Sequence, residues 1–224
     1  MGEDDLHRAG ERTLAVARIS SFAPVAAVNA RTLILGSMPG TESLRAGQYY
    51  AHPRNAFWPI MGELVGAVPA LPYAQRIAAL TRAGIALWDV LESCTRAGSL
   101  DARIDDDSVV ANDFRGFFLR HRAIRRVFFN GAKAEACYRA HVLPGIDCGP
   151  LGYRRLPSTS PAHAALAWRQ KLAAWREIVR AGVQSVPRGQ VDSALASGLT
   201  YGEMMLHVIL PQAIRNMMPS LVTQ

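Results

Sequence analysis

Short strand-like runs alternate with helical segments along most of this chain, and this alternation constrains the fold more than any other feature. The runs are TLIL at 32–35, GIALWDVL at 84–91, RVFF at 126–129 and YRRL at 153–156. Helical patterns separate them, and strands that alternate with helices favour a mostly parallel sheet with both faces covered. We therefore predict a three-layer α/β/α fold around a short, mostly parallel sheet of four strands.

Three segments at the ends of these strands are candidates for the functional site. In open parallel sheets, ligands bind at the carboxyl ends of the strands. GSMPG at 36–40, the Asn130-Gly131 pair and LPSTSPAH at 156–163 each follow a predicted strand. We expect all three at the same edge of the sheet.

The GSMPG turn is weak evidence when it is considered alone. Its small residues let a flat ligand or a phosphate approach the backbone. It matches neither the GxGxxG pattern of dinucleotide sites nor the GxxxxGK[ST] pattern of nucleoside triphosphate sites. The turn therefore predicts a close backbone approach without naming the ligand.

The segment YYAHPRNAFW at 49–58 carries more information. Phe57 and Trp58 fit the buried face of the helix that follows. Tyr50, His52 and Asn55 precede that helix, so they are candidates for contact with a ligand. Asn55 also fits a second role, because asparagine is a common helix N-cap.

Charge and cysteine content exclude several classes of protein. The formal net charge of +7 comes from residues 1–184, and arginine supplies nearly all of the positive charge. Arginine suits phosphate binding, although clusters such as 115–126 also fit a solvated face. The cysteines are Cys94, Cys137 and Cys148, too dispersed for a zinc cluster or a disulfide framework, and this favours the cytoplasm. We expect no signal peptide and no membrane insertion.

In combination, these motifs resemble a known family. GSMPG, YYAHPRNAFW, WDVLESC, FFNGAKA and LPSTSPAHA occur in the order typical of the uracil-DNA glycosylase superfamily, and the chain is most similar to its hypoxanthine-DNA glycosylase branch. The resemblance covers about residues 20–180. It implies a monomeric, monofunctional DNA glycosylase of base-excision repair that flips a deaminated base, hypoxanthine in the first place, and hydrolyses its bond to the sugar. DNA is the implied partner, and neither a metal nor another cofactor is needed.

The resemblance also implies roles for individual residues. Many relatives carry a catalytic Asn or Asp where this chain has Met38, and in the hypoxanthine branch the key carboxamide corresponds to Asn55. Tyr50 is expected to stack on the extruded base. The base pocket is expected to comprise Gly36, Ser37, Met38, Pro39, Tyr50, His52 and Asn130.

The expected DNA-contacting residues lie in the 156–163 loop, which the resemblance places in the groove beside the flipped nucleotide. They are Ser158, Thr159, Ser160 and His163. Ser160 and Pro161 also read as a helix start, and a helix N-terminus favours a phosphate. Several alternatives stay open: Asn130 also fits a helix cap, and His52 and His163 fit either a ligand contact or a structural role.

Residues 185–224 have a different character. They resemble the cytoplasmic coupling loop of amino-acid ABC-transporter permeases, with VPRGQ at 186–190 and ILPQA at 209–213. Forty residues cannot enclose a transport path, which excludes transport by this chain. We predict an N-terminal extension (1–19), a glycosylase domain (20–184) and a helical tail (185–224) outside the core.

Three other functions remain as alternatives. The first is a glycosylase specific for uracil or for G:T and G:U mismatches. The second is a DNA-binding module without catalysis, suggested by Met38. The third is a partner-docking protein that uses the tail.

Overall fold

A parallel four-stranded sheet forms the centre of the molecule. The computed structural model describes residues 17–147 and 149–183. The strand order is β3 (Ile85–Asp89), β2 (Thr32–Gly36), β6 (Arg126–Asn130) and β7 (Gly152–Leu156), and every neighbouring pair is parallel. This confirms the predicted sheet, and the strands lie close to their expected positions.

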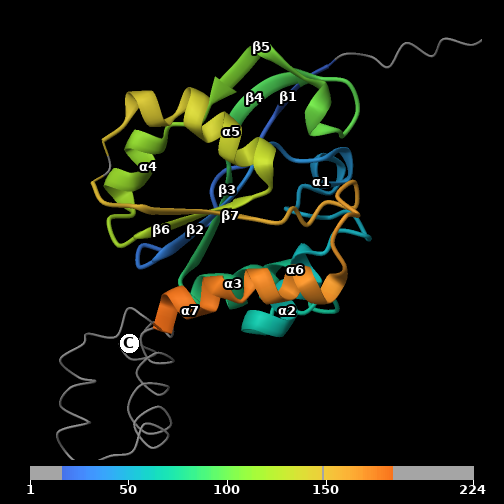
Figure 1. Ribbon diagram of the computed structural model, residues 1–224, viewed down its shortest axis with the longest axis vertical. Helices are drawn as coiled ribbons and strands as arrows, with labels where there is room; N and C mark the ends of the chain where they lie inside the picture. The colour runs from blue at the N-terminus through green and yellow to red at the C-terminus, as the bar shows by residue number, and fades with distance from the viewer. Residues whose placement is uncertain (1–16, 148, 184–224) are drawn as a thin grey trace, which may run out of the picture.

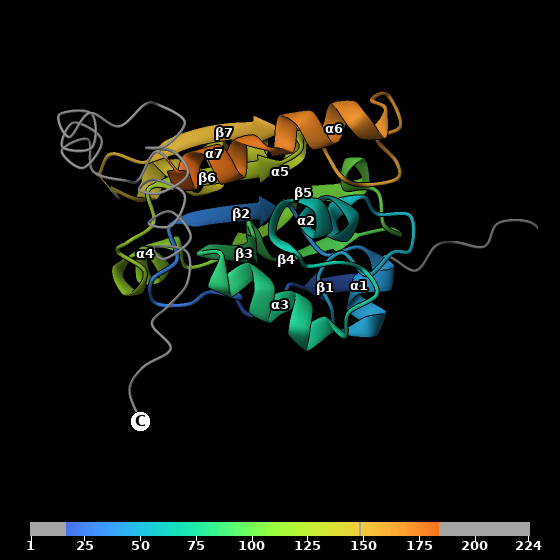
Figure 2. The ribbon, with the colours of Figure 1, turned by 90° about the horizontal axis from the view of Figure 1, so that it is seen from below.

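Helices cover both faces of this sheet and complete the three layers (Figures 1 and 2). Along β2 the side chains alternate, so that Leu33 and Leu35 enter one hydrophobic core and Ile34 enters the other. On the first face lie α4 (Phe114–Arg120) and α5 (Ala132–His141). The second face carries α2 (Phe57–Val65), α3 (Tyr73–Arg82), α6 (Trp168–Trp175) and α7 (Glu177–Val183).

The sequence did not predict a second, antiparallel sheet. It contains β1 (Ala17–Ser20), β4 (Leu91–Arg96) and β5 (Ile104–Ala111), in the order β1-β4-β5. The expected strand at 84–91 is thus divided between two sheets: β3 ends at Asp89 and β4 begins at Leu91. Val90 lies between them and donates its N–H to the Gly36 carbonyl at 2.9 Å. The expected domain boundary after residue 19 falls inside β1.

Three short helical turns fill the connections. They are α1 (Thr41–Ala46), η2 (Asp101–Arg103) and η3 (Leu143–Gly145). The first follows β2, the second follows β4 of the antiparallel sheet, and residues of both line the cavity described below.

The expected helix start at Ser160-Pro161 is wrong. The Ser160 hydroxyl accepts a hydrogen bond from the Ala162 N–H at 3.3 Å, which forms a local turn, and α6 begins only at Trp168. The buried Trp175 indole then donates to the Pro157 carbonyl at 2.9 Å, which fixes α6 against the loop after β7.

No helix in the described ranges is long and apolar enough to cross a membrane. The permease-like segment 185–224 and most of the expected N-terminal extension lie outside these ranges, as does Cys148.

Candidate functional site

A cavity of about 410 Å³ opens at the carboxyl ends of the central strands. Its size is typical of small-molecule sites. Every residue that the sequence analysis assigned to the site lines it, as follows: Gly36, Ser37, Met38, Pro39, Tyr50, His52, Asn55, Asn130, Ser158, Thr159, Ser160 and His163. The fold therefore brings together four segments of the chain, at 36–39, 50–55, 130 and 158–163.

The 36–40 loop forms one wall of the cavity, and two hydrogen bonds from outside the cavity wall hold it in place. Ser37 Oγ donates to Asp101 Oδ2 at 2.7 Å, and the buried Arg96 donates from Nη2 to the Pro39 carbonyl at 2.5 Å. Met38 is only 6% exposed and packs in a hydrophobic core as well as lining the cavity. This wall is therefore rigid, and its third residue is apolar.

Asn55 is half-buried at the start of α2 and lines the cavity. Its Oδ1 accepts a hydrogen bond from the Phe57 N–H at 2.9 Å, and its own N–H donates to the His52 carbonyl at 2.8 Å. The N-cap of α2 is Ala56, which makes no side-chain cap hydrogen bond, so the N-cap alternative for Asn55 is wrong and its side chain closes a local turn onto the Phe57 N–H instead. This turn is compatible with a ligand contact, because it uses only one lone pair of Oδ1 and leaves the Nδ2 donors available.

Tyr50 is the one non-glycine residue with a positive φ, 55°, in the described part of the chain. Such a conformation costs free energy and is found most often at functional sites. Its ring stacks on Phe57 with the centroids 4.0 Å apart. The buried hydroxyl has no hydrogen-bond partner within residues 17–147 and 149–183. Burial, followed by the nearby Asp89, raises the pKa of this phenol far above its usual value.

The two candidate histidines differ in their surroundings. His52 Nδ1 accepts a hydrogen bond from the Arg54 N–H at 3.1 Å, which places the ring proton on Nε2. His163 is exposed at the rim, and its carbonyl accepts a 2.7 Å hydrogen bond from Lys171 Nζ. His52 therefore has a structural contact that leaves Nε2 available to a ligand.

Asn130 does not cap α5, contrary to one of the two alternatives. Gly131 begins the helix with φ at 102° and no side chain caps it. The Asn130 amide instead binds Thr159 twice: Nδ2 donates to Oγ1 at 2.8 Å and Oδ1 accepts from the Thr159 N–H at 2.8 Å. One amide hydrogen and one lone pair stay available for a base.

The most notable group missed by the sequence analysis is the carboxyl of Asp89, which lines the cavity at the end of β3 and is 3% exposed. Burial and, to a smaller extent, the negative charge of Asp101 raise its pKa to about 8, and the positive charge of Arg96 opposes them. An acid at the end of an apolar strand, as in ALWDV, was the signal available in the sequence.

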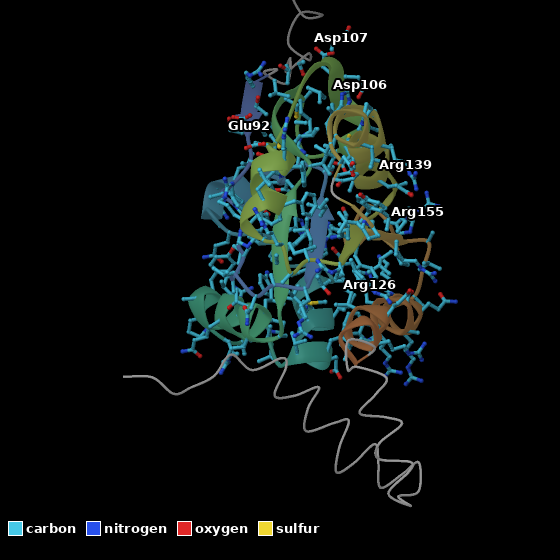
Figure 3. The ribbon with its side chains drawn as sticks, turned by 90° about the vertical axis from the view of Figure 1, so that its left-hand side faces the viewer. Glu92, Asp106, Asp107, Arg126, Arg139 and Arg155 are labelled. Carbon is cyan, nitrogen blue, oxygen red and sulfur yellow. The ribbon has the colours of Figure 1, made fainter. Side chains whose placement is uncertain are left out.

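Several charged residues outside the cavity form surface pairs. Glu135 binds Arg139 at 3.0 Å and Arg155 at 3.3 Å, and Figure 3 shows these arginines on one side of the molecule. The arginine-rich 115–126 stretch leads into the amino end of β6, at the sheet edge opposite the cavity. This position favours the solvated-face interpretation of that cluster.

The comparisons with known proteins agree with this geometry. The family model described as the uracil DNA glycosylase superfamily matches residues 23–181. A hypoxanthine DNA glycosylase from Methanosarcina acetivorans is 35% identical over 162 residues, which cover 71% of this chain and 96% of that protein. Another, from Methanosarcina barkeri, is 40% identical over 116 residues, or 50% of this chain and 71% of that protein.

A solved structure shares the fold as well. The solution NMR structure of a candidate uracil DNA glycosylase from Methanosarcina acetivorans aligns with a TM-score of 0.59 and 32% identity, covering 72% of this chain and 99% of that one. A second family model, the binding-protein-dependent transport system inner membrane component, matches residues 164–224. Curated permeases match the chain over at most 38% of their own length in these comparisons.

Proposed function

The chain belongs to the uracil DNA glycosylase superfamily, and on that premise we propose that it removes hypoxanthine from DNA, with Asn55 as the catalytic residue. The chain is a DNA N-glycosylase, and its substrate is DNA. One observation carries the choice of base: the match to a hypoxanthine DNA glycosylase extends over 96% of that relative.

The proposed reaction starts with extrusion of the damaged nucleotide into the cavity. Extrusion costs a few kcal/mol, and less for a mispaired base such as hypoxanthine opposite thymine. The free face of Tyr50 then stacks on the base, a contact worth ~1–3 kcal/mol. The strained Tyr50 backbone supports this role, because the fold holds the ring in place before the base arrives.

Hydrolysis breaks the bond between C1′ of the sugar and the base. Positive charge develops on the sugar and negative charge on the base, water adds its oxygen to C1′, and the base leaves with a proton. The amide of Asn55 does not titrate, so we assign it to holding the water or the departing base. Its loss is expected to cost about 3 kcal/mol, as for one preorganised donor.

The other pocket residues are assigned by their positions. Asn130 and the 36–40 backbone would contact the edge of the base, and the 156–163 loop, with Ser158, Ser160 and His163, would contact the DNA backbone. Met38 supplies neither charge nor a hydrogen bond, so we propose that this wall only fits the shape of the base. The main support is that all these groups line one cavity.

We also propose that residues 185–224 form a separate unit outside the catalytic domain. The two family models support this division, since one ends at residue 181 and the other covers 164–224. A monomer in the cytoplasm is the proposed form. The free thiols of Cys94 and Cys137 support a reducing compartment such as the cytoplasm.

A panel of labelled duplexes tests the proposed substrate. Each duplex carries one deoxyinosine, one deoxyuridine or one G:T mismatch, and alkali converts abasic sites into strand breaks. We expect the fastest cleavage with deoxyinosine. Preferred cleavage at uracil or thymine would show that this base, and not hypoxanthine, is the substrate. Binding without cleavage of any duplex would favour the non-catalytic module.

A further inference from the structure

One large apolar side chain is exposed at the mouth of the cavity. Leu100 lines the cavity and is 47% exposed. The other exposed large apolar residues of the described chain do not line it; they are Val28, Val68, Val110, Leu119, Tyr153 and Trp168. Single exposed leucines are common on protein surfaces, so the position of Leu100, rather than its exposure, makes it a candidate for contact with DNA.

Hydrogen bonds hold the chain on both sides of Leu100. Before it, Ser99 Oγ donates to Thr41 Oγ1 at 2.5 Å and accepts from the Thr41 N–H at 3.0 Å. After it, Asp101 Oδ2 accepts a hydrogen bond from the Ser37 hydroxyl at 2.7 Å. The fold therefore fixes the position of a side chain that it leaves half in solvent.

A buried arginine joins this loop to the neighbouring wall of the cavity. Arg96 is 3% exposed, and it donates from Nε to the Gly98 carbonyl at 3.0 Å and from Nη2 to the Pro39 carbonyl at 2.5 Å. Gly98 has a φ of 73°, which allows the chain to turn just before Leu100. Leu100 is thus held in a constant position relative to the 36–40 wall of the base pocket.

The 158–163 loop offers no comparable side chain. Its serines and His163 are polar, and its apolar residues, Pro161 and Ala162, carry short side chains. Thr159 is 1% exposed and is bound to Asn130. An extruded nucleotide leaves a gap in the base stack, and proteins that unstack a duplex commonly insert an apolar side chain into such a gap. Among the residues that line the cavity, Leu100 fits this requirement best.

We propose that Leu100 enters the base stack at the gap left by the extruded nucleotide. This inference deepens the proposed function and rests on it, because it takes extrusion of the damaged base into the cavity as given. The leucine side chain is buried between the bases beside the gap, and this apolar contact replaces part of the lost stacking. Since the loop is already fixed, little ordering is needed on binding. Leu100 stabilises the extruded state and takes no part in breaking the bond.

Excision by the wild-type chain, Leu100→Ala and Leu100→Met tests this assignment. One DNA carries deoxyinosine paired with cytosine in a continuous duplex, and the other carries it in a bubble of unpaired bases, where extrusion needs little unstacking. In single turnovers, Leu100→Ala is expected to be about ten-fold slower or more on the duplex, as for a leucine that is no longer buried, and within about two-fold of the wild type on the bubble. Methionine has a similar volume, so Leu100→Met is expected to restore most of the duplex rate.

A fluorescent base reports the extruded state before any bond is broken. The base 2-aminopurine, placed beside the deoxyinosine, is quenched while it is stacked and brightens when its neighbour leaves the stack. At saturating protein in stopped-flow mixing, Leu100→Ala is expected to give a smaller increase than the wild type. Leu119→Ala is the matched control, because Leu119 is 59% exposed on α4 and does not line the cavity, and it is expected to match the wild type in both measurements.

The outcomes distinguish this inference from the proposed function. Leu100 belongs to neither hydrophobic core, so thermal melts are expected to give the same melting temperature for all these proteins. A Leu100→Ala protein that keeps the wild-type rate on the duplex, is slowed equally on duplex and bubble, or gives the wild-type fluorescence increase would overturn the assignment and leave the glycosylase function intact. A wild-type protein that is inactive on both DNAs would remove the proposed function itself.

Discussion

Asn130 and Thr159 are joined by two hydrogen bonds of 2.8 Å, which tie the end of β6 to the loop after β7. Thr159 is 1% exposed, and its carbonyl accepts a 3.0 Å hydrogen bond from the Ala56 N–H beside Asn55. The pair thus links three segments of the cavity wall. Its integrity sets the position of Asn55 as well as that of the loop.

Thr159→Val tests this link. The substitution preserves the shape of the side chain but leaves the half-buried Asn130 Nδ2 without this acceptor, so the free energy of unfolding is expected to fall by about 0.5–1.5 kcal/mol, the net value of one hydrogen bond. Urea unfolding measures the change. Thr159→Ser keeps the hydroxyl and serves as the control; equal stability of the valine and serine variants would show that the hydrogen bond contributes nothing.

Gly36→Ala is expected to abolish most activity. The added Cβ would overlap Asp89 Oδ1, and the β2–β3 pairing leaves neither strand free to move. Excision rates and circular dichroism report the effect on function and fold. Gly145→Ala, where a Cβ meets nothing within 4 Å, is the control and is expected to match the wild type. A fully active Gly36→Ala protein would mean that the carboxyl lies elsewhere when DNA is bound.

Asp89 is expected to make stability depend on pH. Its pKa is about 8 in the folded protein, against an ordinary value of 3.8 for an aspartate. Between these values the folded chain holds a proton that the unfolded chain has lost, so the contribution of Asp89 to stability decreases as pH rises from about 4 to about 8. Asp89→Asn removes this dependence. Urea unfolding of both proteins across this range is expected to show a difference that grows with pH, and a constant difference would contradict the shifted pKa.

Two substitutions of Tyr50 distinguish the role of its ring from the role of its hydroxyl. Tyr50→Phe removes a buried hydroxyl that has no partner in the described residues, so stability is expected to be kept or increased. Tyr50→Ala removes the ring and is expected to weaken selective binding of the lesion by ~1–3 kcal/mol, which corresponds to about 5- to 150-fold. Competition between damaged and undamaged duplexes measures this selectivity. Equal selectivity of Tyr50→Ala and the wild type would exclude stacking on the base.

The sequence predicted the strands that consist of continuous apolar runs, because such runs indicate burial directly. The apolar runs of β2, β3 and β6 are buried along most of their lengths, and this pattern needs no knowledge of partners. The antiparallel sheet escaped prediction because β5, IDDDSVVA, carries three consecutive aspartates that suggest a loop. Pairing with β4 overrides that local preference.

Contacts over long separations in the sequence were beyond prediction. The motifs placed Asn55, Tyr50 and Asn130 at one edge of the sheet, and all three line the cavity. The sequence did not reveal that Asn130 binds Thr159, 29 positions away, or that Asp89 is buried close enough to Tyr49 and Tyr50 to raise the pKa of both phenols. Ser160-Pro161 carries a helix-start signal, but the serine side chain closes a local turn instead.

The central claim is that the Asn55 carboxamide performs the chemistry, and single-turnover excision of deoxyinosine by Asn55→Ala and Asn55→Ser tests it most directly. Serine can still accept the hydrogen bond from the Phe57 N–H, but it does not replace the amide. Both variants are expected to react about 100-fold more slowly than the wild type, with the dissociation constant for the duplex changed only a few-fold. A wild-type rate in either folded variant would contradict the claim.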